Sequence, residues 1–252
     1  MPSPFVYRED LIMGNENGER LNKYLSEAGI CSRREADRQI EAGNVLINGR
    51  TATVGQRVLP EDEVTFMGIK VGGKQKPVLL LVNKPIGIVS TAEKREKNNI
   101  VDFINYPTRL YPVGRLDKDS HGLILMTNIG EVMDKILKAK NNHEKEYIVR
   151  VNKPITYDFV EKMSKGVYLK DLDKTTRPCQ VEKISKFEFK IVLMQGMNRQ
   201  IRRMCQELGY RVKDLERVRI VNLKLDGIPL GGYREITDEE YLQLAMKLRD
   251  SE

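Results

Sequence analysis

Residues 114–123 read Gly-Arg-Leu-Asp-Lys-Asp-Ser-His-Gly-Leu, a tight polar turn that leads directly into an apolar run. The run Leu-Ile-Leu-Met-Thr that begins at Leu123 is typical of a buried strand. The turn therefore places one arginine, Arg115, and two carboxylates, Asp117 and Asp119, at the end of a strand, where a deep site can form. Most aspartates in turns only accept hydrogen bonds from nearby backbone, so the role of Asp117 depends on the rest of the chain.

The composition is that of a soluble globular protein. Of the 252 residues, 31% are charged and 40% are hydrophobic, and this length favours two domains of about 100 to 200 residues each. The longest apolar runs, such as residues 78–82, are far shorter than the roughly 20 residues that cross a bilayer. The first residues lack the basic and apolar regions of a secretion signal. We expect a cytoplasmic protein with no membrane partner, and no heptad pattern indicates more than a monomer.

The cysteines and histidines are too scattered to predict a metal site. Cys31, Cys179 and Cys205 lie far apart with no C-x-x-C pair, and only His121 and His143 could join them as soft ligands. Each cysteine is most simply a small buried hydrophobe in a reducing compartment. We therefore expect no metal.

The net charge of +7 favours a polyanionic partner. Residues 1–76 carry 11 basic and 11 acidic residues, so the whole excess, 32 against 25, follows them. Residues 195–219 contain seven arginines and lysines but only three acids. This segment is predicted to be a phosphate-facing surface.

The first part of the chain predicts two helices and a hairpin. Apolar residues recur at helical spacing over residues 21–28, just before a glycine that can end the helix. Ser32 with Glu35 three residues later fits the capping box of a second helix, which ends at Gly43. Residues 45–50, Val-Leu-Ile-Asn-Gly-Arg, predict a strand and an Asn-Gly hairpin.

The remaining chain predicts a linker and a larger α+β domain. Residues 68–77 combine glycines, lysines and a proline, as a linker does. Strands and helices then alternate irregularly and without a phosphate-binding glycine loop, which argues against a doubly wound parallel sheet. The predicted strands cover residues 78–82, 123–127, 145–151 and 187–194, and the predicted helices cover 131–139, 158–165 and 199–208, the last between Asn198 as N-cap and Gly209.

Several of these motifs resemble those of a known family. Residues 19–67, with Arg-Leu-Asn-Lys-Tyr-Leu, Ser-Arg-Arg-Glu-Ala and Val-Leu-Ile-Asn-Gly-Arg, resemble the S4 RNA-binding domain. Gly-Arg-Leu-Asp at 114–117, Lys-Glu-Tyr-Ile-Val at 145–149 and Gly-Met-Asn-Arg-Gln-Ile-Arg-Arg-Met at 196–204 resemble the three motifs of the S4-domain pseudouridine synthases. The resemblance implies an N-terminal extension with an S4 domain over 1–67, a linker over 68–77, and over 78–252 a catalytic domain with a mixed, mainly antiparallel sheet and a central cleft.

The resemblance also implies a reaction and a catalytic residue. These enzymes cut the bond between uracil N1 and ribose C1′, turn the base and rejoin it through C5, so the atoms are rearranged without redox change and no cofactor is expected. The indispensable Asp of the first motif corresponds to Asp117, which either attacks C1′ or removes the C2′ proton. Arg202, in the third motif, would pair with Asp117, because a nearby cation favours the ionised form of a sheltered carboxylate. The alternative for Arg202 is an exposed helix face.

Two further motif residues have implied roles at the target base. Arg115 matches the family arginine that fills the gap left by an extruded uridine and so offsets part of the cost of unstacking; its alternative is a phosphate contact or a surface ion pair. Tyr147 matches the tyrosine that stacks on uracil and assists removal of the C5 proton, whereas a strand tyrosine is otherwise a core residue. Asp119 is expected to cap the turn and His121 to lie at the surface.

Other basic residues are expected to contact RNA from the S4-like module and from the third motif. The alternative for the arginines of the second helix is a solvated helix face. The predicted RNA-binding residues are Lys23, Arg33, Arg34, Arg38, Arg199 and Arg203.

The resemblance is strongest to family members that modify a uridine in a structured loop of 23S rRNA, which implies that substrate and, as a second one, the anticodon loop of a tyrosine tRNA. Relatives that act on 16S rRNA share the motifs and are an alternative. A non-catalytic RNA-binding protein of ribosome assembly would explain the charge but not the joint presence of the four motif residues. A hydrolytic glycosidase that uses Asp117 and Asp119 would instead release free uracil.

Overall fold

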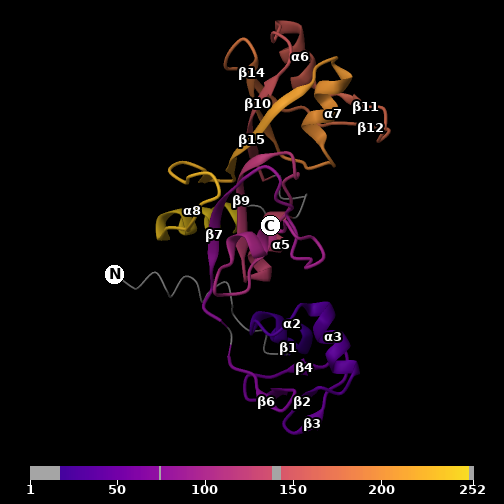
Figure 1. The fold of residues 1–252 in the computed structure, drawn as a ribbon, viewed down its shortest axis with the longest axis vertical. Coiled ribbons are helices and arrows are strands. Elements are labelled where there is room, and N and C mark those ends of the chain that lie inside the picture. The colour runs from indigo at the N-terminus through magenta and orange to yellow at the C-terminus, as the bar shows by residue number, and fades with distance from the viewer. Residues whose placement is uncertain (1–17, 74, 138–142, 250–252) are drawn as a thin grey trace. The chain divides into compact units, whose positions relative to one another are not determined.

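The computed structural model describes residues 18–73, 75–137 and 143–249 (Figure 1). The chain forms two compact units, of which one comprises Met1–Val78 with Tyr106–Arg109 and the other Leu79–Asn105 with Leu110–Glu252. Each unit has a hydrophobic core of its own. The predicted extension before residue 18 lies outside the described residues.

The first unit consists of two helices that bury their apolar faces against short strands. Helices α2 (Leu21–Glu27) and α3 (Arg33–Glu41) share one core with these strands. The Ser32 hydroxyl accepts a hydrogen bond from the Glu35 backbone N–H at 3.2 Å, which confirms the predicted start of α3. The strands are β1 (Glu19–Arg20) paired with β4 (Arg57–Val58), and a sheet of β3 (Arg50–Thr51), β2 (Val45–Ile47), β5 (Val64–Phe66) and β6 (Ile69–Lys70).

The turns and strands of this unit can be compared with the predicted hairpin and the predicted linker. The β2–β3 hairpin turns at Asn48 and Gly49, whose φ angles of 51° and 76° are those of the expected Asn-Gly turn. The linker was predicted to begin too early, because Ile69–Lys70 pairs with β5 and Val71 is buried in the core. The glycine-rich composition did not predict this strand, which is held in place by its backbone hydrogen bonds.

The second unit is built on a nine-stranded sheet. Its strands are β7 (Leu79–Lys84), β8 (Tyr111–Val113), β9 (His121–Thr127), β10 (Lys145–Val151), β13 (Gln180–Lys183), β14 (Glu188–Leu193), β15 (Val212–Ile220), β16 (Leu223–Lys224) and β17 (Tyr233–Glu235). The order is β13-β14-β10-β15-β9-β7-β17, with β16 beside β15 and β8 beside β9. Among the described strands only β9 and β15 pair in parallel, which confirms a mixed, mainly antiparallel sheet and the α+β class.

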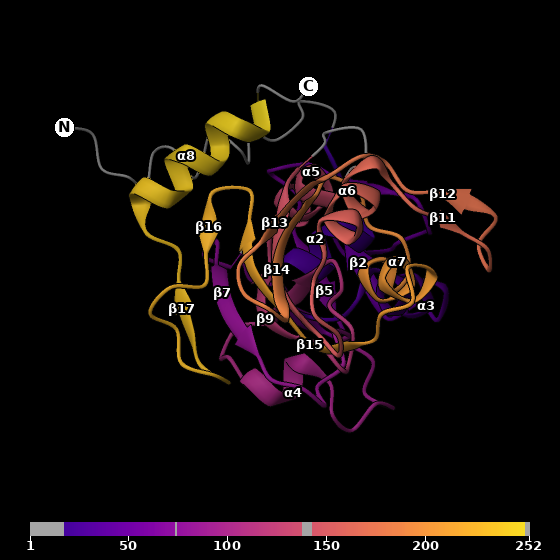
Figure 2. The ribbon, with the colours of Figure 1, turned by 90° about the horizontal axis from the view of Figure 1, so that it is seen from above.

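Two helices hold one face of this sheet. The helices of the unit are α4 (Ile100–Ile104), α5 (Gly130–Leu137), α6 (Tyr157–Lys165), α7 (Gln200–Glu207) and α8 (Asp238–Arg249), and a small hairpin joins β11 (Tyr168–Leu169) to β12 (Lys174–Thr175). Phe159 of α6 and Met204 of α7 share a core with Val149, Phe189 and Leu215 of the sheet. Figure 2 shows α7 and the β11–β12 hairpin to one side of β14 and β15, whereas α8 lies near β16 and the edge strand β17 of the same sheet. The start of α7 is thereby held close to β10, β14 and β15.

The predicted strands and helices of this unit are present within a few residues of their predicted bounds. Residues 138 and 139 of one predicted helix lie outside the described part of the chain. Strand β15 was missed, because its charged residues were assigned to a phosphate-facing surface. Arg217 is in fact only 3% exposed, and Arg219 pairs with Glu144 and Glu146. Two register shifts where β15 meets β10 also interrupt the alternation that would have predicted the strand.

Helix α7 begins one residue later than predicted. Its N-cap is Arg199, with a φ of 50°, rather than Asn198. Asn198 instead accepts hydrogen bonds from Arg203 through its backbone and side-chain oxygens, and the Gln200 side chain accepts one from the Met197 N–H at 3.1 Å. A left-handed conformation in a residue with a long side chain costs about 1 to 3 kcal/mol and is concentrated at functional sites.

The start of α8 is fixed by a capping box and an ion pair. Thr237 Oγ1 accepts from the Glu240 N–H at 3.2 Å, and Glu240 Oε2 accepts from the Thr237 N–H at 2.9 Å. Arg234 donates two further hydrogen bonds to the Glu240 carboxylate, at 2.6 and 2.7 Å. The hydrogen bonds from Arg234 hold the pKa of Glu240 below its usual range, although burial opposes the shift.

Replacing Glu240 by Gln is expected to destabilise the protein by about 1 to 2 kcal/mol at pH 7. Because the folded-state pKa of Glu240 is lowered, the stabilisation is present above the unfolded pKa and is lost as the pH falls through the folded one. The unfolding free energies of the variant and the parent, measured with denaturant, should therefore converge as the pH falls below the folded-state pKa of Glu240. Glu239→Gln is the control, with a change within about 0.5 kcal/mol; equal effects of the two substitutions would contradict the assignment.

Candidate active site

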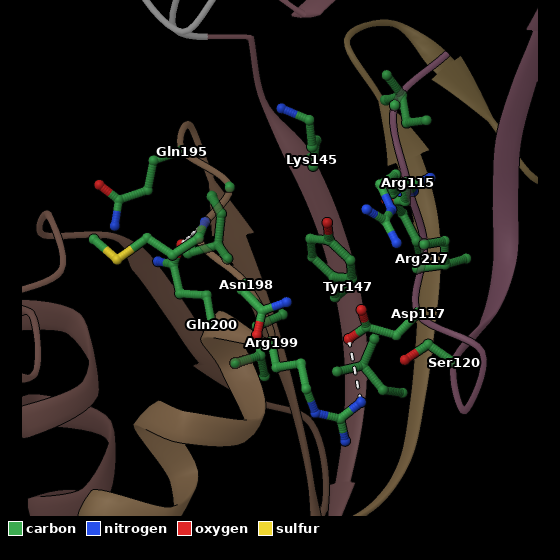
Figure 3. Close-up of a pocket in the computed structure, with 18 of the residues that line it drawn as sticks. Arg115, Asp117, Ser120, Lys145, Tyr147, Gln195, Asn198, Arg199, Gln200 and Arg217 are labelled. Atoms are coloured by element: carbon green, nitrogen blue, oxygen red, sulfur yellow. Dashed lines mark hydrogen bonds and ion pairs between the residues drawn. The ribbon is translucent and has the colours of Figure 1, made fainter. Parts of the chain in front are cut away.

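One pocket of the second unit collects residues from segments far apart in the sequence. It has a volume of about 480 Å³ and lies between the loop that precedes β9, strands β10, β14 and β15, and the start of α7 (Figure 3). Arg115, Asp117, Tyr147, Arg199 and Arg202 all line it. The structure thus brings the four residues of the three sequence motifs into one cavity, together with one of the predicted RNA-binding arginines.

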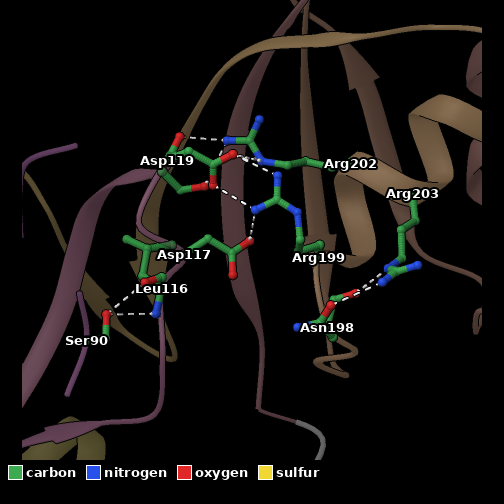
Figure 4. Close-up of polar contacts among 9 residues, drawn as sticks. Ser90, Leu116, Asp117, Asp119, Asn198, Arg199, Arg202 and Arg203 are labelled. Atoms are coloured by element: carbon green, nitrogen blue, oxygen red, sulfur yellow. Dashed lines mark hydrogen bonds and ion pairs between the residues drawn. The ribbon is translucent and has the colours of Figure 1, made fainter. Parts of the chain in front are cut away.

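The loop that carries Asp117 is anchored through its backbone. The buried Ser90 hydroxyl donates to the Leu116 carbonyl at 2.8 Å and accepts from the Leu116 N–H at 3.1 Å, as Figure 4 shows. The Gly87 N–H donates to the Lys118 carbonyl at 2.7 Å. Asp117 is held between these two anchors, and its side chain, 37% exposed, borders the pocket.

A buried lysine organises the segment that provides these anchors. The Lys84 side chain is fully buried, and its ammonium donates to the carbonyls of Pro85 at 3.0 Å and Ile88 at 2.9 Å. Burial, and after it repulsion by Arg217, lowers the pKa of Lys84 to about 8. The ammonium is thus held by carbonyl dipoles, which fixes the backbone on either side of Gly87.

Arg199 makes the contact to Asp117 that the sequence assigned to Arg202. Arg199 Nη1 lies 3.8 Å from Asp117 Oδ2. Arg202 instead donates to the Asp119 carbonyl at 2.7 Å and to Ser120 Oγ at 3.0 Å (Figure 4). The prediction that Arg202 pairs with Asp117 is therefore wrong in this structure. Arg199 is the N-cap of α7 and Arg202 lies in its first turn, and the left-handed N-cap directs the side chain of Arg199 to the carboxylate.

Asp119 connects the Asp117 loop to α7, a role that the sequence did not predict. Its carboxylate accepts two hydrogen bonds from Arg199, at 2.9 and 2.7 Å, and lies 3.5 Å from Arg202 Nε. The hydrogen bonds from Arg199, followed by attraction to Arg202, hold the pKa of Asp119 below its usual range, although burial opposes them. Asp119 therefore fixes both arginines, whereas the sequence indicated only a turn cap.

Tyr147 and Arg217 face one another across β10 and β15. The buried guanidinium of Arg217 donates to the Leu123 carbonyl at 2.6 Å and to the Arg115 carbonyl at 3.3 Å, so it joins three segments of the site. Sequence reasoning gave Arg217 no individual role. The available signal was its spacing from Leu215, because two residues on the same side of a strand are both expected to be buried or both exposed.

Sequence reasoning assigned no role to two more pocket residues, Lys145 and His143, although Lys145 is the first residue of the second motif. Lys145 lies on β10, and its ammonium makes one weak hydrogen bond, at 3.4 Å, to the His143 carbonyl. Burial, and then repulsion by Arg217, lowers the pKa of Lys145. Burial also lowers the pKa of His143, whose Nε2 has no hydrogen-bond partner among the described residues.

His121 was expected at the surface, but it is largely buried at the start of β9. Its Nε2 lies 3.0 Å from Asp214 Oδ1, and its Nδ1 lies 3.7 Å from Glu216 Oε1. Both acids belong to β15, the strand that pairs in parallel with β9. His121 is therefore an interstrand contact and does not line the pocket.

The predicted RNA-binding residues differ in whether an ion pair within the protein already holds their side chains. Arg33 and Arg34 are exposed on α3 and form no ion pair among the described residues. Lys23 pairs with the glutamates four residues before and after it, and Arg38 with the glutamate three residues before it. Arg203 pairs with an aspartate between β11 and β12 and lies outside the pocket.

No metal site was expected, and within the described ranges no cluster of three or more His, Cys, Asp or Glu side chains could hold a metal ion. The three cysteines are free. Burial raises the pKa of Cys179 to about 11 and that of Cys205 to about 12, as for unreactive thiols. No helix within the described ranges is both long and apolar enough to span a bilayer.

Comparison with known proteins assigns this fold and pocket to a class. Residues 78–207 match the family model of RNA pseudouridylate synthase, and residues 19–64 match that of the S4 domain. The chain belongs to the RNA pseudouridylate synthase family, and it is an enzyme that isomerises uridine in RNA to pseudouridine.

Individual relatives are similar in sequence to this chain over most of their length. The dual-specificity RNA pseudouridine synthase RluF of Escherichia coli (strain K12) is 53% identical over 238 residues, which are 94% of this chain and 81% of the relative. Ribosomal large subunit pseudouridine synthase B of Bacillus subtilis (strain 168) is 34% identical and covers 90% of this chain and 95% of its own. A crystal structure of a pseudouridylate synthase superposes with a TM-score of 0.66 at 28% identity, covering 90% of this chain and all of the other. The S4-domain type of pseudouridine synthase is therefore confirmed.

Proposed function

We propose that this enzyme modifies a uridine in 23S rRNA and, as a second substrate, a uridine in the anticodon loop of a tyrosine tRNA. The similarity to a large-subunit synthase and the greater similarity to a dual-specificity RNA synthase support the two substrates. The ribosomal small subunit pseudouridine synthase A of Escherichia coli (strain K12) is 31% identical, so a 16S rRNA target has less support. The observation that carries the catalytic part of the proposal is the gathering of all four motif residues in one pocket.

Asp117 is the group that acts on the ribose in this proposal. It either attacks C1′ or takes the C2′ proton, and both routes require its carboxylate to be ionised. Arg199, 3.8 Å away, is a counterion of that carboxylate. Arg202 acts indirectly, because its hydrogen bonds to Asp119 and Ser120 hold the loop against α7.

Arg115 and Tyr147 act on the base. Arg115 is exposed at the rim of the pocket, where a planar cation can occupy the space that an extruded uridine leaves in its stack. Tyr147 is half-buried with its ring beside Asp117 in Figure 3, so that a uracil can stack on it while the ribose meets the carboxylate. The tyrosine hydroxyl then assists removal of the C5 proton.

The substrate is tested by tritium release from C5-labelled transcripts of 23S rRNA, 16S rRNA and tyrosine tRNA. The proposal expects release from 23S rRNA and from the tRNA, and none from 16S rRNA. Release from 16S rRNA alone would replace the substrate proposal. Mapping pseudouridine across total RNA from cells that lack the protein identifies the modified nucleotide independently.

The exposed arginines of α3 are proposed to bind the RNA backbone. Replacing both Arg33 and Arg34 by Ala is expected to weaken RNA affinity about tenfold and to lower the dependence of log K on log salt by about two, because each phosphate contact releases roughly one counterion. The rate at saturating RNA should stay the same, since neither residue is in the pocket.

The control for this pair is Lys186→Ala with Lys224→Ala, which removes the same charge elsewhere. An equal loss of affinity in the control would show that net charge alone, and not the S4 unit, binds the RNA. Filter binding at several salt concentrations measures both quantities.

We also propose that the protein acts as a cytoplasmic monomer. The support is that the described residues of one chain supply the whole pocket and that ribosomal RNA is modified where ribosomes assemble. Sedimentation with and without RNA tests the oligomeric state, and a dimer under both conditions would refute it.

A further inference from the structure

The pocket contains two buried or partly buried cations, Lys145 and Arg217, that the protein leaves without a carboxylate. Within the described ranges, neither Lys145 nor Arg217 has a carboxylate oxygen within 4.0 Å, whereas Arg199, Arg202 and Arg219 each have at least one. The Arg217 side chain is buried, and its Nη2 has no hydrogen-bond partner among the described residues. Because a buried charge without a counterion is costly, a pocket that retains two of them is suited to an anion.

The two cations lie along the surface on which the base would stack. Lys145 and Tyr147 are two residues apart on β10, so their side chains leave the same face of the sheet, and Arg217 is paired with Tyr147 in the register of β15. In the view of Figure 3, the tyrosine ring lies between Lys145 and Asp117. A uracil stacked on Tyr147 with its ribose at Asp117 therefore extends its carbonyl groups toward Lys145.

The reaction produces an anion at this position. When the bond between N1 and C1′ breaks, both of its electrons stay with the base, and the detached uracil carries a negative charge shared by N1, O2 and O4. The base then turns, and C5 forms the new bond to C1′ by displacing Asp117 or by adding to the glycal. The C5 proton leaves to solvent with the help of the Tyr147 hydroxyl, and N1 takes up a proton, so the product is an isomer of the substrate. Preorganised cations stabilise charge that develops in a water-poor site more strongly than they stabilise the neutral substrate.

We propose that Lys145 and Arg217 bind the detached uracil anion and lower the barrier to glycosidic bond cleavage. The proposal rests on the function proposed for Asp117 and Tyr147, and assigns to the same site two more catalytic residues. A phosphodiester group is the other anion that could meet the two cations. The phosphodiester group is attached to the ribose, which lies at Asp117. The carbonyl edge of the base is therefore closer to Lys145 than the phosphodiester group is. The lowered pKa of Lys145 is consistent with an ammonium that is buried beside Arg217 and awaits a counterion.

The test compares two leaving groups. Transcripts carry either uridine or 5-fluorouridine at the target position, and formation of the C-glycoside is followed under single-turnover conditions by digestion to nucleosides and liquid chromatography with mass spectrometry, which separates the C-glycoside from its isomer of equal mass. Fluorine withdraws electrons and stabilises the uracil anion without help from the protein. Lys145→Met is expected to slow the uridine reaction about 100-fold and the 5-fluorouridine reaction less than about tenfold, with RNA affinity changed less than about threefold.

Two further variants complete the design. Lys145→Arg retains the positive charge and should restore most of the uridine rate, whereas Lys190→Met, on β14 and paired with Glu182 outside the pocket, should leave both rates unchanged. Arg217 also holds two backbone carbonyls, and its replacement can disturb the sheet, so Lys145 carries the test and Arg217→Lys is measured beside it.

Two outcomes would overturn the inference alone. One is an equal loss of rate on both substrates with an active parent enzyme. The other is a loss of RNA affinity with a salt slope reduced by about one, which would identify a phosphodiester contact. A parent enzyme that forms no product from any of the RNAs would instead refute the proposed function, and the inference would fall with it.

Discussion

Asp117→Asn will abolish pseudouridine formation, with a loss of at least about 10⁴-fold in the single-turnover rate, as when a covalent or proton-abstracting group is removed. The amide has nearly the same shape as the carboxylate, but it can neither attack C1′ nor accept the C2′ proton. The fold should be unaffected, because the only ion pair of Asp117 in the described structure is the 3.8 Å contact to Arg199. Tritium release measures the activity, and thermal unfolding measures the stability.

RNA affinity separates loss of chemistry from loss of binding in this variant. Asp117→Asn should bind RNA within about threefold of the parent, since the removed charge does not attract phosphate. The matched control is Asp158→Asn, an exposed aspartate at the start of α6 whose only ion pair among the described residues is with Lys162, and it should keep full activity. A variant at Asp117 with more than a tenth of the parent rate would assign the chemistry to another group.

Gly122→Ala will destabilise the second unit by about 2 to 5 kcal/mol. Gly122 has a φ of 101°, and a Cβ added there would lie 2.4 Å from the Arg217 carbonyl oxygen and 2.8 Å from the Arg217 nitrogen. Both are backbone atoms of the strand that pairs in parallel with β9, so neither can move aside without breaking the pairing. The substitution should also reduce activity, because Arg217 is displaced from the pocket.

The control for Gly122 is Gly72→Ala. Gly72 has no heavy atom within 4 Å of an added Cβ and no positive φ, so its replacement should change stability by no more than about 0.5 kcal/mol. Denaturant unfolding followed by circular dichroism measures both variants. A Gly122→Ala protein as stable as the parent would mean that β9 and β15 are less closely paired than the structure shows.

The basic residues of residues 195–219 separate into groups that composition cannot distinguish. Arg199 and Arg202 are bound by Asp119, and Arg219 is bound by two glutamates, so their charges are largely neutralised within the fold. Arg217 retains its charge in the interior. The net charge of the segment therefore overstates what it offers to RNA. A local count of charges predicts a polyanionic partner correctly only when the acidic residues that form ion pairs with the segment in the folded protein are known.

The sequence by itself determined the class of the fold, the approximate bounds of most helices and strands, and the residues of the three motifs. These properties depend on local order: periodic burial, capping residues such as Ser32, and short motifs in which neighbouring residues act together. The hairpin turn at Asn48 and Gly49 also depends on local sequence, because these two adjacent residues determine the type of turn.

Only the tertiary structure decided which charges meet. The partner of Asp117 is Arg199 rather than Arg202 because a left-handed N-cap turns one side chain toward the loop. Arg217 and Lys145 are part of the site because β15 lies between β9 and β10. This arrangement joins segments about one hundred residues apart. Ion pairs and burial depend on distances of a few ångströms between such segments, and the order of residues along the chain does not contain those distances.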